Sequence, residues 1–487
     1  MQIRRFSFFL IIHFISLILI IESLFFLLAV IVSFIYHEEV RGQMVTSLFI
    51  LLIPGLLLFL LTVNKRLSNL TKKESIFIVA SGWVVMALFG SVPYLITKAI
   101  PQFSYAFFES MSGFTTTGSS ILTDVEALPE SILFWRSETH WIGGMGIIVL
   151  IIALSPVLIY NSFHLYCSEM SNVVDDRAMT RIKYFARRLW LIYIGLTFIE
   201  TISLKIAGMP LFDSICHSFA TVATGGFSTK NASLAAYSPA IQYIVMFFMV
   251  LSGMNFMVHV LALKGNFTKI RKSEELKFYL LIMFVAGTII SVALMCIKSM
   301  PLEASVRNAF FQVVSVLTAT GFVSNDYLLW PPFSVMIIMM LMLVGASSGS
   351  TGGGVKVIRN VIALKKVRQS FKNIAHPNAI NYVRYNGHIL KSDQVLSVLA
   401  FIILYYLIVG GGTFFMMCLG LDKSTSFGAV VTTMGGIGPG FGNVGPTGNF
   451  SQIPEAGKYF LATIMVVGRL EIYPVLIILT PWFWKDN

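Results

Sequence analysis

Charged residues are scarce in this chain. Only 12% of its 487 residues are Asp, Glu, Lys or Arg, whereas soluble globular proteins carry about 25%. This scarcity excludes a soluble cytosolic or secreted enzyme. Hydrophobic residues make up 56% of the chain, and apolar runs of roughly 20 residues, each long enough to cross a ~30 Å hydrocarbon core, recur from end to end. The sequence therefore predicts a polytopic membrane protein.

Cysteine is equally sparse. The four cysteines are far apart and form no C-x-x-C pair, which argues against a zinc site or a redox pair. The net charge of +12 would suggest a nucleic-acid partner for a soluble domain. In a membrane protein it is explained by basic residues in cytoplasmic loops, so we expect a lipid bilayer and no nucleic acid as the partner.

The apolar segments predict two N-terminal helices and four similar units. The first run, 6–36, is too long for the apolar core of a signal peptide and precedes no small-residue cleavage site, so we expect it to remain as a helix. A second helix is expected at 45–63. Each unit then has a spanning helix, a short half-apolar helix, a Thr/Gly turn and a second spanning helix. The expected spanning pairs are 76–97 with 137–158, 189–207 with 240–263, 278–297 with 333–358, and 394–418 with 457–482.

The predicted fold is an all-α polytopic membrane protein with four M1–pore helix–M2 repeats in a pseudo-fourfold arrangement around one pore. It has ten spanning helices and four re-entrant half-helices. The expected divisions are an N-terminal helix pair at 1–75 and repeats at 76–188, 189–272, 273–392 and 393–487. Lys and Arg concentrate in the segments that a cytoplasmic N-terminus would place inside. This bias predicts that both termini are cytoplasmic and that all four turns enter the membrane from outside.

The four short helices share one pattern that ends in glycine. The aligned windows are F-E-S-M-S-G-F-T-T-T-G at 108–118, C-H-S-F-A-T-V-A-T-G-G at 216–226, F-Q-V-V-S-V-L-T-A-T-G at 311–321 and G-A-V-V-T-T-M-G-G-I-G at 428–438. Non-helical backbone at membrane depth is tolerated only when it is buried in protein or lines a water-filled cavity. Glycine permits φ > 0, so the carbonyls of four such turns can face one axis. A ring of carbonyls can replace the hydration shell of a monovalent cation, and the negative ends of the half-helices favour a cation there.

A simpler alternative is that these small-residue turns only let helices pack closely. Four turns at matching offsets favour the ion site instead. Further distinctive stretches are H-W-I-G-G-M-G-I-I-V at 140–149, A-T-G-G-F-S-T at 223–229, G-S-T-G-G-G-V-K-V-I-R at 349–359, G-I-G-P-G at 436–440 and G-R-L-E-I-Y-P at 468–474. With F-T-T-T-G at 114–118, they make the chain resemble, over essentially its whole length, the potassium-translocating subunits of the Trk/Ktr/HKT superfamily, closest to the TrkH type.

The resemblance implies a K⁺ selectivity filter with one key glycine in each turn, namely Gly118, Gly226, Gly321 and Gly438. The filter residues that it implies are Thr116, Thr117, Gly118, Thr224, Gly225, Gly226, Thr320, Gly321, Gly436, Ile437 and Gly438. In the second turn Gly225 is an alternative to Gly226. The fourth turn lacks a threonine before its glycine, and a looser wall there could weaken the discrimination of K⁺ from Na⁺.

A glycine-rich run interrupts the second helix of the third repeat. Each glycine disfavours a helix by about 1 kcal/mol, so 345–354 should unwind, although a kink driven by packing is an alternative. The resemblance implies that this loop is a gate below the filter. The expected gate residues are Gly345, Gly349, Ser350, Thr351, Gly352, Gly353, Gly354, Lys356 and Arg469.

Arg469 lies in an otherwise apolar span. An arginine at the centre of a membrane helix costs about 2.5–3.5 kcal/mol on insertion scales, so its side chain should face protein or water. One alternative is an ion pair with Glu471 or another carboxylate. The other alternative is the role that the resemblance implies. The Arg469 side chain would project into the pore, where its charge raises a barrier to cations and its guanidinium holds the loop by the loop's carbonyls. Lys356 and Arg359 could assist from the end of the loop or extend to the cytoplasmic surface.

Other polar residues carry weaker signals. Acidic residues that follow the turns could concentrate cations at the external mouth or simply lie in solvated loops; they are Asp124, Glu126 and Asp326. Three histidines in or near apolar segments have no partners at metal-ligand spacing and are expected to be structural; they are His140, His217 and His259.

The predicted function is K⁺ uptake across the bacterial cytoplasmic membrane, with K⁺ as the transported ion and no catalytic cofactor. The alternatives are less selective K⁺/Na⁺ permeation and K⁺ symport coupled to H⁺ or Na⁺. An intramembrane enzyme would need facing Asp, His or Ser residues, and no such constellation is apparent. By resemblance, the partners are a second copy of the chain and a cytosolic nucleotide-binding regulatory ring of the TrkA type. The chain has no P-loop, so the nucleotide would bind to the ring.

Overall fold

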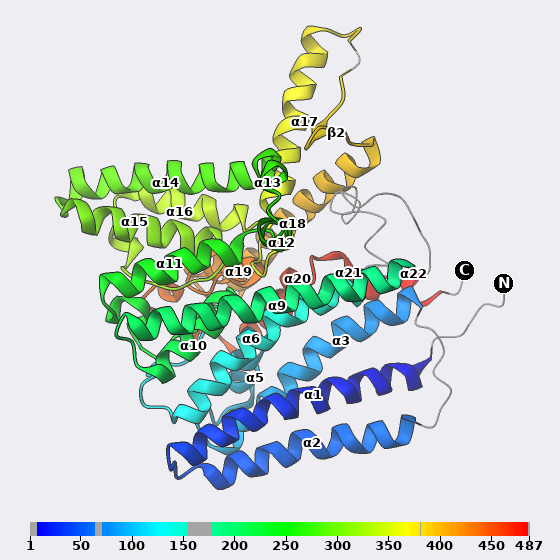
Figure 1. Cartoon of the computed structure of the whole chain (residues 1–487), viewed down its shortest axis with the longest axis vertical. Coiled ribbons are helices and arrows are strands. Elements are labelled where there is room, and N and C mark those ends of the chain that lie inside the picture. Colours follow the sequence, from blue (N-terminus) through cyan, green and yellow to red (C-terminus); the bar gives the residue numbers. More distant parts are fainter. Residues whose placement is uncertain (1–6, 64–70, 154–176, 380, 486–487) are drawn as a thin grey trace.

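The computed structural model describes residues 7–63, 71–153, 177–379 and 381–485, and these are almost entirely helical (Figure 1). Most of the long helices run side by side, and both ends of the described chain lie on the same side of the bundle (Figure 1). The one described sheet is a hairpin of β1 (Arg384–Tyr385) and β2 (His388–Ile389), paired antiparallel. Asn386 and Gly387 both have positive φ values, as a tight two-residue hairpin turn requires.

The two N-terminal helices form an antiparallel pair at one edge of the bundle. They are α1 (Phe8–Ile35) and α2 (Arg41–Val63). Only α1 of the two packs against both α3 (Lys72–Gly90) and α6 (Glu130–Ala153). The outer helix, α2, leaves Leu60 and Leu61 more than half exposed, which suits a helix that faces lipid.

Four three-helix units follow. Besides α3 and α6, they contain α5 (Phe103–Phe114), α9 (Arg177–Ile206), α10 (Leu211–Val222), α11 (Pro239–Gly253), α14 (Glu274–Lys298), α15 (Leu302–Leu317), α16 (Pro332–Val344), α18 (Ser392–Cys418), α19 (Lys423–Gly435) and α20 (Glu455–Arg469). The boundaries expected at 76 and 189 fall inside α3 and α9.

The units close into a ring of four. The second helix of each unit packs against the half-helix of the next, in the pairs α6–α10, α11–α15, α16–α19 and α20–α5. The last of these pairs joins the fourth unit to the first. The four units therefore surround a common centre, which confirms the predicted all-α, pseudo-fourfold fold.

The predicted second spans of repeats two and four are wrong as continuous helices, whereas the second helix of repeat three is interrupted after Val344, where the glycine run was expected to unwind it. After α11, the chain turns by 96° into α12 (Phe256–Leu263), and the Asn255 side chain caps this new helix by accepting a hydrogen bond from the Met257 amide at 2.9 Å. In repeat three, α16 ends at Val344. In repeat four, α20 is followed by α21 (Tyr473–Ile478) after Glu471 and Ile472 adopt positive φ values. Among the described residues, six helices, or seven with the bent pair, are long and apolar enough to span a membrane.

Shorter elements connect these helices. They are α4 (Val92–Ile96), α13 (Phe267–Lys272), α22 (Pro481–Trp484), and the 3₁₀ turns η1 (Ser233–Ala236), η2 (Tyr327–Leu329) and η3 (Gly442–Val444). A longer helix, α17 (Val357–Ala375), projects from the bundle together with the β-hairpin (Figure 1).

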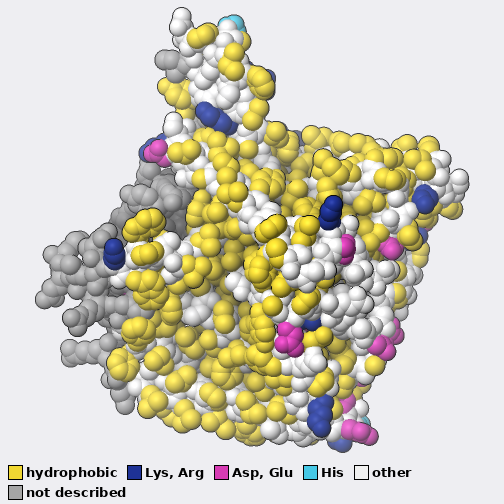
Figure 2. Space-filling view, turned by 180° about the vertical axis from the view of Figure 1, so that it is seen from behind, with side chains coloured by type: hydrophobic (Ala, Val, Ile, Leu, Met, Phe, Trp, Pro, Cys, Tyr) yellow, Lys and Arg dark blue, Asp and Glu magenta, His cyan; other side chains and the backbone are white. Residues whose placement is uncertain are grey.

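The outer surface is strongly apolar. Figure 2 shows a face on which hydrophobic side chains cover most of the area and charged side chains are few. Large side chains such as Phe284 and Phe414 are exposed by 64% and 69%. Apolar patches of this extent are rare on soluble monomers, and they are what a helix bundle needs when its solvent is lipid.

Candidate ion-conduction site

The four half-helices end in turns with the same backbone conformation. In each turn a residue with left-handed φ is followed, two positions later, by a glycine with positive φ. The pairs are Thr116 with Gly118, Thr224 with Gly226, Ala319 with Gly321, and Gly436 with Gly438. The left-handed conformation costs a non-glycine residue roughly 1–2 kcal/mol. Three turns therefore hold a strained residue at the first position, and only the fourth relieves the strain with glycine.

The second residue of each pair belongs to a closed structure that we call the glycine ring: Gly118, Gly226, Gly321 and Gly438. Each ring glycine lies against a backbone carbonyl oxygen of the following turn, so there is little room for a side chain. A Cβ atom would lie under 3.0 Å from Gly225 O for Gly118, from Thr320 O for Gly226 and from Ile437 O for Gly321, and at 3.0 Å from Gly118 O for Gly438. The contacts run from the first turn through the fourth and back to the first.

Gly226, and not Gly225, matches the other ring glycines. Gly226 has φ of +82°, beside +77° for Gly118 and +84° for Gly321. Gly225 instead packs behind the turn, where a Cβ atom would collide with the imidazole of His140. That imidazole stacks on Phe227 with 4.1 Å between ring centroids.

A buried ion pair supports the first two turns from behind. Arg136 Nε lies 2.7 Å from Glu109 Oε1, and the two side chains are 3% and 0% exposed. The carboxylate of Glu109 also accepts hydrogen bonds from the Ser120 hydroxyl and the Ile121 amide, which follow the first ring glycine. The guanidinium of Arg136 donates to Ser228 O at 3.1 Å, beyond the second ring glycine. One ion pair thus connects two turns.

Neither Arg136 nor Glu109 is among the site residues predicted from the sequence. The available signal was Glu109, an acidic residue inside an otherwise apolar half-helix. A charge that is buried without a partner is strongly destabilising, so Glu109 requires a nearby cation. The sequence does not show which cation this is, since Arg136 lies 27 positions away from Glu109 in the chain.

The residue at the position equivalent to Glu109 differs between the four half-helices. In the second half-helix it is His217, whose Nδ1 lies 2.7 Å from Asp213 O and whose Nε2 lies 2.9 Å from the Ser228 hydroxyl. Because Asp213 O only accepts, Nδ1 carries the proton and Nε2 accepts from Ser228. In the third it is Gln312, whose side-chain amide has no hydrogen-bond partner in the described structure. In the fourth it is Ala429, which has no polar side chain.

A cavity of about 220 Å³ lies on one side of the glycine ring, among the loops that follow the turns. It is lined by all four ring glycines, with Arg136 and Lys230 as the charged side chains, and no described acidic residue lines it. The expected acidic residues hold loops together instead. Asp124 accepts from the Asn231 side chain at 2.8 Å, and this hydrogen bond lowers the pKa of Asp124. Asp326 caps η2.

The glycine run 345–354 lies on the opposite side of the ring and contacts the ends of three half-helices. We call it the glycine loop; it joins α16 to α17 without helical structure. The Thr351 hydroxyl donates to Val222 O at 3.1 Å. Gly352 and Gly353 pack so closely on Thr318 O and Gly435 O that a Cβ atom would collide with each oxygen. The loop therefore lies against the C-terminal ends of the second, third and fourth half-helices.

Arg469 holds the glycine loop through backbone oxygens. Its Nη1 donates to Thr351 O at 2.7 Å and its Nη2 to Gly143 O at 2.9 Å. The alternative ion pair with Glu471 is not formed, because the Glu471 carboxylate pairs with Arg359. Lys356 bonds to Gly352 O through Nζ. Lys356 and Arg359 are only 4% and 6% exposed, so neither extends to the surface.

The other end of the glycine loop is tied to the bend between α11 and α12. The Phe256 amide donates to Gly349 O at 3.1 Å, and the Ser347 amide donates to Gly253 O at 3.1 Å. The carboxylate of Glu275 accepts from the Ser348 amide at 2.6 Å. The loop therefore connects several repeats.

No group of three or more His, Cys, Asp or Glu side chains that could hold a metal ion occurs among the described residues. His259 bonds to Leu251 O through Nε2 at 2.9 Å. The oxygen atoms that pack against the ring glycines are backbone carbonyls, and a ring of carbonyls can coordinate an alkali ion.

The chain is similar to known cation transport proteins along most of its length. The family model described as "Cation transport protein" matches residues 40–482. The Trk system potassium uptake protein TrkH of Escherichia coli K12 is 35% identical over 93% of this chain and 95% of its own length. TrkH of Halomonas elongata is 34% identical over 98% and 99%. The crystal structure of the potassium transporter TrkH from Vibrio parahaemolyticus superimposes with a TM-score of 0.90 at 33% identity, covering 99% of this chain and all of that one. These are transport proteins and not enzymes, and the chain belongs to their family, TrkH.

Proposed function

We propose that this protein carries K⁺ into a bacterial cell through the centre of the glycine ring. The observation that carries the proposal is the closure of the ring, in which each glycine meets a carbonyl of the next turn. A pathway that passes between four backbone turns gives an ion the same type of ligand on every side. The relatives' names, potassium uptake proteins, support K⁺ as the ion.

Selectivity in this proposal comes from the backbone carbonyls of Thr116 to Gly118 and the matching residues of the other turns. A dehydrated K⁺ would exchange its water for these oxygens. The C-terminal ends of the half-helices carry partial negative charge and point toward the same region, which favours a cation over an anion.

The weaker support behind the fourth turn favours a second candidate, permeation that discriminates K⁺ from Na⁺ only modestly. Ala429 provides no hydrogen bond at the position where Glu109 and His217 brace the first two turns. A wall that shifts more easily can contract around the smaller ion. Bi-ionic reversal potentials with K⁺ on one side and Na⁺ on the other distinguish the two candidates, and their response to pH tests for coupled H⁺ symport.

The glycine loop is the gate in this proposal. It lies beneath the ring, and the hydrogen bonds from Arg469 hold its Thr351 carbonyl in place. A fixed positive charge also raises the energy of a nearby cation. Opening therefore requires the loop to leave the half-helix ends and Arg469 to give up at least one of its two carbonyl partners.

We further propose that both termini are cytoplasmic, that the protein forms homodimers, and that a cytosolic nucleotide-binding ring controls the gate. The basic, exposed end of α13 supports a docking role for this side of the bundle, since Lys269, Arg271 and Lys272 lie there. The loop's ties to the α11–α12 bend give a route by which a docked partner could act on it.

Flux of ⁸⁶Rb⁺ into proteoliposomes tests the proposed function. Protein supplied with its regulatory partner should take up the ion, and external K⁺ should compete better than Na⁺. A folded preparation that shows no uptake would contradict the proposal. Uptake that Na⁺ and K⁺ inhibit equally would favour the less selective candidate.

A further inference from the structure

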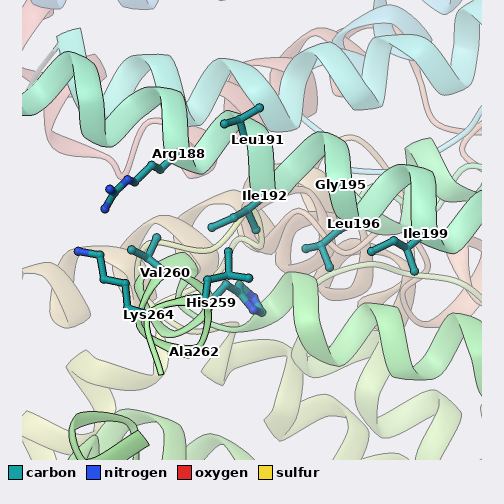
Figure 3. A pocket seen from close by; sticks show the side chains of 11 residues that line it. Arg188, Leu191, Ile192, Gly195, Leu196, Ile199, His259, Val260, Ala262 and Lys264 are labelled. Carbon is teal, nitrogen blue, oxygen red and sulfur yellow. The ribbon is translucent and has the colours of Figure 1, made fainter. Parts of the chain in front are cut away.

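A groove on the membrane-facing surface lies between α9 and α12. It has a volume of about 580 Å³, and apolar side chains line most of it (Figure 3). Leu191 and Ile199 of α9 and Leu263 of α12 are each more than half exposed there. An exposed apolar groove at this place faces hydrocarbon, so lipid chains are its natural occupants.

One end of the groove is basic. Arg188 of α9 and Lys264, which follows α12, lie together at that end, with their charged groups directed toward the same space (Figure 3). No acidic side chain is found among the described residues that line the groove. Two cations beside an apolar channel match the chemistry of a lipid phosphate with an acyl chain attached. Basic pockets between membrane helices are typical sites for anionic headgroups.

The length of the groove suits one leaflet. From Arg188 to Ile199 a helix rises by about 16 Å, which is roughly half of a ~30 Å hydrocarbon core. The basic end lies toward the first residues of α9, on the side that carries both ends of the described chain (Figure 1). A lipid held there would belong to the leaflet on that side.

We propose that this groove binds an anionic phospholipid, with its phosphate between Arg188 and Lys264 and an acyl chain along α9. Zwitterionic lipids carry a compensating positive charge and gain less from the two cations. The apolar part of the groove alone would not distinguish the two lipid classes, so the specificity lies at the basic end.

The groove adjoins the glycine loop through α12. His259 lines the groove and bonds across the bend to Leu251 O, while the first residue of α12, Phe256, donates its amide to Gly349 O. A lipid packed on Val260 and Leu263 therefore restrains the short helix that holds one end of the loop. Its effect on ion flux rests on the gate role proposed above, whereas its binding does not.

Native mass spectrometry of the delipidated full chain, titrated with phosphatidylglycerol or phosphatidylcholine, tests the binding site. Phosphatidylglycerol should bind more tightly than phosphatidylcholine. The double variant R188Q/K264Q should bind phosphatidylglycerol roughly 30-fold more weakly, equivalent to about 2 kcal/mol at ~1 kcal/mol for each basic residue. The matched control R187Q/K277Q removes two exposed cations outside the groove and should bind like the unchanged protein.

Equal binding of the two lipids, or equal loss in both double variants, would overturn the proposal. A dimer that dissociates only in R188Q/K264Q would also overturn it, because the groove would then hold a second copy of the chain.

Ion flux in proteoliposomes with and without phosphatidylglycerol tests whether the bound lipid acts on the glycine loop. A change that R188Q/K264Q abolishes supports the link to the loop. Lipid binding in a protein that conducts no ion in any liposome would refute the proposed function and not the lipid site.

Discussion

The first and fourth turns reach the same backbone conformation by different means. In the first, the loop after the ring glycine is held by the carboxylate of Glu109, itself paired with Arg136. In the fourth, the loop after the ring glycine is held through Gly440 O, which accepts a hydrogen bond from the Tyr327 hydroxyl at 2.6 Å. Tyr327 belongs to the third repeat, and Gly440 itself packs directly on the backbone of Gly428. Equal geometry therefore does not imply equal stiffness. A charged pair resists displacement more strongly than one neutral hydrogen bond.

The largest effect is expected from breaking the ion pair behind the first turn. Arg136→Gln leaves Glu109 buried without its cation, so the free energy of unfolding should fall by about 3–5 kcal/mol. Thermal unfolding in detergent measures the loss. The variant R136Q/E109Q removes both charges and should recover much of the stability. If it were as unstable as the single variant, the pair would not be the reason for the effect.

The second-largest effect is expected from substitution of the ring glycines, and it should differ between the first turn and the fourth. Gly118→Ser places a side chain against Gly225 O with no space for it, whereas Gly438 has its nearest carbonyl at 3.0 Å. Both positions have positive φ, which adds about 1–2 kcal/mol of strain. G118S should abolish ⁸⁶Rb⁺ uptake, and G438S should retain part of it with poorer selectivity for K⁺ over Na⁺. Identical behaviour of the two variants would show that the turns are equivalent.

Release of the glycine loop should have an intermediate effect. Arg469→Gln removes the charged donor that holds Thr351 O and Gly143 O, so the closed arrangement loses stability relative to the open one. Basal flux without the regulatory partner should rise on the order of tenfold for each ~1.4 kcal/mol lost. Replacement of Gly349 to Gly354 by a shorter linker should act in the same direction. Unchanged or lower flux in both variants would remove the gate assignment.

The smallest effect is expected from the neutral hydrogen bond at the fourth turn. Tyr327→Phe removes the bond to Gly440 O and should cost about 0.5–1.5 kcal/mol. The measurable result is a modest shift of the bi-ionic reversal potential toward Na⁺, with uptake retained. Tyr405→Phe is the matched control, because the Tyr405 hydroxyl is buried without a hydrogen-bond partner in the described structure. A shift as large as that of G438S would contradict the ranking.

Much of this architecture is predictable from the sequence because it repeats. Four glycines at matching offsets behind half-apolar helices identified the turns that form the ring, and the glycine run at 345–354 identified the unwound loop. Hydropathy did not reveal the helix breaks at Asn255 and Ile472, because apolar residues continue across both. Such breaks depend on local caps and backbone strain.

Contacts between residues that are far apart in the sequence could not be predicted either. Glu471 was a candidate partner for Arg469 because the two are close in sequence. Residues two positions apart on a helix do not face each other, and α20 ends at Arg469, so Glu471 turns away to Arg359. The oxygens that Arg469 binds belong to residues that lie more than 100 positions away. Composition and spacing carry no information about such contacts.

Crystals soaked in Rb⁺ offer the most direct test of one shared ion pathway. The anomalous difference map should contain a peak on the axis of the glycine ring, within coordination distance of carbonyl oxygens from more than two turns. The same crystals in Na⁺ supply the control. An empty ring, or Rb⁺ bound only between helices elsewhere in the bundle, would contradict the account.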